Sequence, residues 1–108
     1  MLAKKFRLPK ETRFDNFSFS QPFFFLKIAK NKEKNSRFGV IVSKKVDKRA
    51  VVRNRLRRAF INCIDSQIIE IKTGYDTLFI VRKKSLEKES MELCASIRGS
   101  FLKNNLLK

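Results

Sequence analysis

SKKVDKRAVVRNRLRR, residues 43–58, joins the end of an expected strand to the first turns of an expected helix. No acidic residue occurs from Lys48 to Ile64. A helix on an ordinary solvated surface interleaves its charges, because like charges at i,i+4 repel each other. Here Arg49, Arg53 and Arg57 follow one another at i,i+4 steps. Such a helix is suited to a polyanion, so the stretch predicts a surface that binds RNA or DNA.

The composition of the whole chain agrees with this prediction. Its 108 residues include 26 Lys and Arg against 10 Asp and Glu, a formal net charge of +16. Such a surplus attracts nucleic acid or anionic membranes. However, no apolar run approaches the roughly 20 residues of a membrane span, and the first residues lack the apolar stretch of a signal peptide. We therefore expect a cytoplasmic protein with no membrane partner. The length predicts one domain, residues 1–108.

The spacing of apolar residues predicts the element order α-β-β-α-β-α. A short helix is expected over residues 8–17, strands over 23–29, 37–43 and 76–82, a long helix from residue 50 with Gly74 as its terminator, and a final helix capped by Ser85. Val52, Leu56 and Phe60 form the apolar stripe of the long helix. Helices on one face of a small sheet make an α+β fold, a two-layer α/β sandwich, whose other sheet face is open to a ligand. The two strands that flank the long helix are expected to be parallel.

A catalytic role for the chain's own side chains finds no support in the sequence. The chain has no histidine, the residue most used as a general base near neutral pH. Its acidic residues are scattered, and no paired-carboxylate metal site is indicated. We therefore predict no catalytic residue, no metal ligand and no small-molecule substrate.

The two cysteines, Cys63 and Cys94, are far apart in sequence. Two lone cysteines without close spacing are weak evidence for a metal site or a disulfide. Both fall on expected apolar helix faces, so we interpret them as small buried hydrophobic residues.

The basic stretch has a physical means of binding RNA. Arginine presents a planar fork of donors that matches phosphate oxygens, and lysine adds an adaptable point charge. Asn54, set among arginines, is suited to hydrogen-bond a sugar, a base or a hydrated metal ion. Phenylalanines beside a basic helix offer stacking surfaces to unpaired bases, although most of the eleven are expected in the core.

Two segments together resemble the protein component of bacterial ribonuclease P. They are RFGVIVSKK at residues 37–45 and AVVRNRLRR at residues 50–58, which contain the family's Ser-Lys-Lys strand end and its Arg-Asn-Arg core. Val81-Arg82-Lys83 is similar to the Ala-Arg-Lys that commonly ends the family's next strand. Arg7-Leu8 followed by Phe14 is similar to the family's opening.

The resemblance implies a specific function. Ribonuclease P is an endoribonuclease that removes the 5′ leader from precursor tRNA, and its catalytic RNA subunit performs the hydrolysis with Mg²⁺. The protein subunit, inactive alone, binds this RNA and holds the leader between the sheet and the helices. The resemblance also implies a left-handed β-α-β crossover, against the usual right-handed rule.

The resemblance and the basic pattern together predict a set of RNA-binding residues and a tentative leader cleft. The RNA-binding set is Lys44, Lys45, Lys48, Arg49, Arg53, Asn54, Arg55, Arg57 and Arg58. The leader-cleft set is Phe14, Phe17 and Phe25. Because Arg53 and Arg58 lie beside or behind the apolar stripe, replacing either by alanine is predicted to weaken RNA binding with the fold largely intact.

Two alternatives account for part of the same pattern. A basic ribosomal protein of similar architecture would share the charge and the size, but it would not prefer precursor tRNA to mature tRNA. A self-sufficient metal-dependent nuclease would cleave precursor tRNA with Mg²⁺ and no added RNA.

Overall fold

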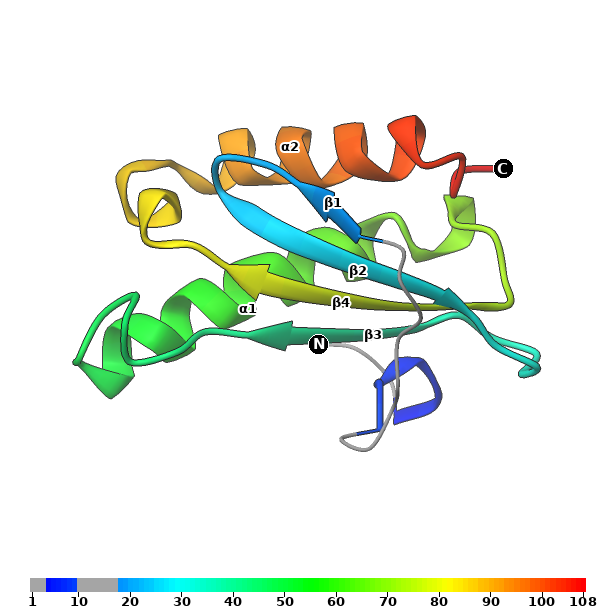
Figure 1. Ribbon diagram of the computed structural model, residues 1–108, viewed down its shortest axis with the longest axis horizontal. Helices are drawn as coiled ribbons and strands as arrows, with labels where there is room; N and C mark the ends of the chain where they lie inside the picture. The colour runs from blue at the N-terminus through cyan, green and yellow to red at the C-terminus, as the bar shows by residue number, and fades with distance from the viewer. Residues whose placement is uncertain (1–3, 10–17) are drawn as a thin grey trace.

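The computed structural model describes residues 4–9 and 18–108, in which a four-stranded sheet carries two α-helices on one face (Figure 1). In chain order its elements are the 3-10 helix η1 (Lys4–Phe6), strands β1 (Ser18–Ser20), β2 (Phe24–Lys30) and β3 (Arg37–Ile41), helix α1 (Ala50–Ser66), the 3-10 helix η2 (Ile68–Glu70), strand β4 (Tyr75–Val81), the 3-10 helix η3 (Lys83–Glu87) and helix α2 (Ser90–Lys103). The predicted α+β sandwich is confirmed.

The strand order of the sheet is β1-β2-β4-β3. Strand β4 therefore lies between β2, to which it is antiparallel, and β3, to which it is parallel. Helix α1 connects the two parallel strands, as expected for a β-α-β unit. The handedness of this crossover stays a prediction.

Alternation along the strands divides the sheet into a buried and a more open face. On β2, Phe24 and Leu26 are fully buried, whereas Phe25 between them is half-buried on the opposite face. The Phe79 ring of β4 lies 6.0 Å from the Phe60 ring of α1 and 5.8 Å from the Phe101 ring of α2. Both helices thus cover the same face of the sheet, and the other face is left for a ligand or the N-terminal segment.

The apolar stripe of the long helix is confirmed. Val52, Leu56 and Phe60 are at most 7% exposed. Helix α1 ends at Ser66, however, so the prediction that Gly74 terminates it was wrong. Gly74 instead has a φ of +91° in the turn before β4, a conformation that glycine adopts without a steric penalty.

Ser85 does not cap the final helix, which begins at Ser90. The hydroxyl of Ser85 is buried and donates a 2.6 Å hydrogen bond to the carbonyl of Phe23, just before β2. A serine that would satisfy a helix end locally is here used for a contact distant in sequence.

Two further differences concern the N-terminal third. Strand β1 was not predicted, because Ser18-Phe19-Ser20 is short and has no extended pattern; it forms by antiparallel pairing with residues 25–27 of β2. Of the short helix predicted over residues 8–17, only Leu8 and Pro9 lie within the described residues, and neither is helical.

The interpretation of Cys63 and Cys94 as separate buried thiols was wrong, because the two form a disulfide. It joins α1 to α2 with 5.3 Å between the two Cα atoms, and 31 positions separate the cysteines in sequence. Sequence spacing did not reveal the bond, since it depends on how two distant helices pack.

Candidate nucleic-acid interface

Two buried valines hold the loop that follows β3. Val42 and Val46 are 5% and 4% exposed, and the Val46 amide donates to the Ser43 carbonyl at 3.0 Å. The turn between these anchors leaves Lys44 and Lys45 exposed. Both predicted RNA-binding lysines therefore face solvent because the apolar neighbours on either side are buried.

Asp47 organises the start of α1. Its carboxylate accepts hydrogen bonds from the backbone amide of Arg49 at 2.8 Å and from the Arg49 guanidinium at 3.1 and 3.0 Å. These bonds, with the side-chain bond contributing most, lower the pKa of Asp47 to about 2. Part of the Arg49 guanidinium is thus engaged within the chain, and its predicted contact with RNA would use its remaining donors.

Arg53 has a structural contact that the sequence pattern did not predict. Its Nη1 donates to the carbonyls of Asp47 and Lys48 at 3.1 and 2.8 Å. The half-buried side chain thereby ties the loop to the first turn of α1. Charge-assisted bonds of this kind are stronger than neutral ones.

The exposed face of α1 carries the remaining predicted residues. Asn54, Arg55 and Arg58 are exposed, and Lys48 is exposed just before the helix. The Nη1 of Arg57 donates to the Asn54 side-chain oxygen at 2.9 Å, which orients the amide of Asn54. The helix therefore presents a mixed donor surface in which arginine and asparagine side chains are partly fixed before any ligand binds.

The end of β4 adds three basic residues that were not assigned to the site from the sequence. Because β3 and β4 are parallel and in register at Ile41 and Ile80, the residues after both strands lie at the same end of the sheet. Figure 1 shows both arrowheads there, beside the start of α1. We call the resulting surface the basic edge; its exposed residues are Lys44, Lys45, Arg82, Lys83 and Lys84. A basic triplet after the second strand of a parallel pair is the signal that could have revealed it.

An aromatic side chain borders the basic edge on the open face of the sheet. The Arg82 guanidinium carbon lies 5.9 Å from the centre of the Phe25 ring, and its Nη2 donates to the Ser20 hydroxyl at 2.9 Å. The geometry is that of a cation–π pair whose guanidinium is also held by its hydrogen bond to Ser20 of strand β1. Phe25 is the tentative cleft residue that the structure places; Phe14 and Phe17 lie outside the described residues.

Metal-ligand clusters are absent from the described part of the chain. No three His, Cys, Asp or Glu side chains gather there in a way that would hold an ion. Asp47 and Asp76 are each bound by an arginine instead. In the same residues no helix is long and apolar enough to span a membrane.

We predict different outcomes for alanine at Arg53 and at Arg58. Arg53→Ala removes two bonds to loop carbonyls and should lower the free energy of unfolding by about 1 kcal/mol, whereas Arg58→Ala should leave it nearly unchanged. Thermal unfolding monitored by circular dichroism measures both. Arg53→Lys is the matched control, because it keeps the charge but lacks the planar guanidinium. Equal stability of the unchanged protein and these three variants would contradict the structural role of Arg53.

Comparison with known proteins identifies the family of this chain. The family named Ribonuclease P matches residues 2–105. The ribonuclease P protein component of Clostridium kluyveri is 38% identical over 93 residues, covering 84% of this chain and 82% of that protein. The component of Clostridioides difficile is 42% identical over 83 residues, covering 76% and 72%.

Solved structures share the fold. The ribonuclease P protein of Thermotoga maritima superposes with a TM-score of 0.71 at 26% identity, covering 77% of this chain and 78% of that one. The Staphylococcus aureus protein has a TM-score of 0.77 at 22% identity, covering 85% and 84%, and supports the fold alone. The family match across nearly the whole chain, together with these relatives, shows that the chain belongs to the ribonuclease P protein family.

Proposed function

We propose that this chain is the RNA-binding subunit of ribonuclease P, that it docks on the catalytic RNA, and that it binds the 5′ leader of precursor tRNA. In this role it assists Mg²⁺-dependent removal of the leader and is inactive alone. The RNA subunit performs the hydrolysis, and the protein acts in the cytoplasm.

The observation that carries the proposal is the convergence of three separate segments, the two of the basic edge and the start of α1, at one end of the sheet. The loop after β3, the residues after β4 and the start of α1 all bring exposed Lys or Arg to one end of the sheet. Each RNA phosphate neutralised there releases counterions, so each contact lowers the logarithm of the affinity by roughly 0.7–0.9 for every tenfold rise in salt concentration. The chemistry is that of holding a polyanion, not of cleaving it.

The open face of the sheet supports binding of an unpaired strand. Phe25 and the guanidinium of Arg82 form adjoining flat groups at the border of the basic edge. Bases of single-stranded RNA stack on such groups without requiring a particular sequence. A leader whose phosphates contact the lysines would therefore find a stacking surface beside them.

Magnesium enters the proposal as an ion held by RNA. No three His, Cys, Asp or Glu side chains of the described residues gather to hold it, and the carboxylates of Asp47 and Asp76 are engaged by arginines. Mg²⁺ prefers several waters together with phosphate or carboxylate oxygens. We accordingly assign this chain the neutralisation of phosphates near such ions and no step through a metal of its own.

The test is reconstitution with a bacterial ribonuclease P RNA at a Mg²⁺ concentration too low for the RNA alone to cleave precursor tRNA efficiently. We expect the protein to raise the rate of precursor tRNA cleavage at least roughly tenfold, equivalent to about 1.4 kcal/mol of activation free energy. Cleavage is followed by gel separation of the 5′ leader. No stimulation would refute the proposal.

Two controls separate the alternatives. Equal affinity for precursor and mature tRNA would favour a basic ribosomal protein. Cleavage of precursor tRNA by the purified protein with Mg²⁺ and no RNA subunit would favour a nuclease in its own right.

A further inference from the structure

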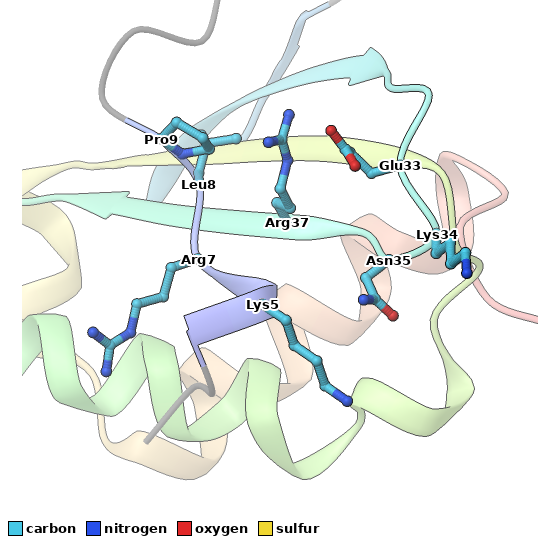
Figure 2. A pocket seen from close by; sticks show the side chains of 8 residues that line it. All are labelled: Lys5, Arg7, Leu8, Pro9, Glu33, Lys34, Asn35 and Arg37. Atoms are coloured by element: carbon cyan, nitrogen blue, oxygen red, sulfur yellow. The ribbon is translucent and has the colours of Figure 1, made fainter.

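A concave surface lies at the opposite end of β3 from the basic edge. It is an open cleft of about 740 Å³ between the N-terminal segment and the turn that joins β2 to β3. Figure 2 shows Lys5, Arg7, Leu8 and Pro9 on one side of it and residues 33–35 of the turn on the other. Nothing in the site described above uses this cleft.

The N-terminal wall of the cleft is fixed to the sheet. The Leu8 amide donates to the carbonyl of Phe38 at 2.9 Å, and Arg7 forms a parallel bridge to the same residue. The Leu8 side chain also lies over Gly39, where an added Cβ would come within 3.1 Å of it. Gly39 thus allows the segment to lie closely against β3.

The floor of the cleft is formed by Arg37, which is paired with Asp76. Arg37 donates to the two carboxylate oxygens of Asp76 at 2.9 and 2.8 Å, and the side-chain amide of Asn31 donates to the same carboxylate at 2.7 Å. Asp76 is 4% exposed. The hydrogen bond with Asp76 is the main cause that raises the pKa of Arg37. The Arg37 charge is therefore balanced within the protein.

The exposed charged side chains at the rim are mostly basic. Lys5, Arg7 and Lys34 are exposed around the cleft, and Glu33 is the one acidic residue among those that line it. Glu33 lies on the turn, whose backbone is fixed by a 2.9 Å bond from the Glu33 amide to the Asn31 side chain. An open cleft with a mostly basic rim attracts anionic groups such as phosphate.

The position of the cleft relates it to the basic edge. Arg37 at the start of β3 and Lys44 after its end are about seven residues apart, which is roughly 23 Å of extended chain. A stacked strand that advances roughly 3.4 Å per nucleotide, as in a duplex, would need roughly seven nucleotides to reach from one to the other. One RNA of that length can contact both surfaces.

We propose that this cleft is a second phosphate-binding site for RNA, in which Lys5 and Lys34 neutralise backbone phosphates beyond those held at the basic edge. The inference rests on the proposed RNA-binding function and extends it to the other end of the sheet. The phosphates belong either to the RNA subunit or to the single-stranded leader, and the experiment includes one arm for each.

The test compares two variants that remove the same charge. Lys5→Gln/Lys34→Gln changes the cleft, and Lys103→Gln/Lys108→Gln changes exposed lysines in and after the last turn of α2. Affinity for a bacterial ribonuclease P RNA and for a leader oligonucleotide of 12 nucleotides is measured by fluorescence anisotropy across a salt series. We expect the cleft variant to reduce the salt slope by roughly 1.4–1.8 in at least one arm, and the α2 variant to change it little.

The outcomes separate this site from the function itself. The RNA that loses slope is the RNA that the cleft binds. Equal losses for both variants, or none for the cleft variant, overturn the second site. Lys44→Gln/Lys45→Gln is measured in parallel: if it weakens binding while the cleft variant does not, the proposed function stands and only the second site fails.

Discussion

Replacing Lys44, Lys45, Lys83 and Lys84 together by glutamine should lower the affinity for ribonuclease P RNA roughly 10²–10³-fold at 0.15 M salt. All four side chains are exposed at the basic edge, so the fold has little need of them. Relative to 1 M salt, each phosphate contact contributes roughly 0.6–0.7 log units at 0.15 M, because its counterions are released on binding. Anisotropy titrations with labelled RNA measure the loss, and circular dichroism verifies the fold.

The prediction tests the parallel pairing of β3 and β4 as well as the charge. Lys83→Gln/Lys84→Gln alone should lose about half of the logarithmic effect, although the two residues lie far in sequence from the basic stretch that begins at Ser43. Lys103→Gln/Lys108→Gln supplies the loss caused by net charge alone. If the loss per lysine were the same in α2 as at the basic edge, the edge would have no special role.

Reducing the disulfide between Cys63 and Cys94 should have the largest effect on stability. The bond closes a loop of about 31 residues. In the chain-entropy account, such a closure stabilises the folded state by roughly 3–4 kcal/mol, by restricting the unfolded chain. For a chain of this size we expect the midpoint of thermal unfolding to fall by roughly 10 °C or more on reduction.

The measurement is calorimetry of the same oxidised protein with and without dithiothreitol. Cys63→Ala/Cys94→Ala is the control, since its midpoint should not respond to the reductant. Two titratable thiols in the unreduced protein would show that the bond does not form. Disulfides are rare in reducing compartments, so the reduced sample also measures the stability that the chain would have in such a compartment.

The parts of the fold that follow from local pattern were predictable. The stripe of Val52, Leu56 and Phe60 repeats at helical spacing, and its burial follows from burying apolar surface on one side of a helix. The three longer strands are rich in β-branched and aromatic residues, which set their positions to within a residue or two. Local chemistry and tertiary packing agree in these elements.

The remaining features depend on contacts between distant segments. Strand β1 exists because β2 offers it a pairing edge, and the buried hydroxyl of Ser85 bonds to Phe23 rather than to its own helix. The basic residues that follow β4 join the site only through the sheet order. The bond from the Arg49 amide to the Asp47 carboxylate is different: it spans two residues, the spacing of an Asx turn, so it could have been predicted from the sequence.

The place of β4 in the sheet has a consequence for how the protein is made. Strands β2 and β3 do not pair with each other, and both pair with β4, which follows them in sequence. During synthesis, β2, β3 and helix α1 are therefore translated before β4, the strand that pairs with both β2 and β3. Because such non-local pairing is slow and leaves strand edges open until it occurs, the sheet forms late in synthesis. The cationic helix is exposed to cellular RNA before the fold that orients it is complete.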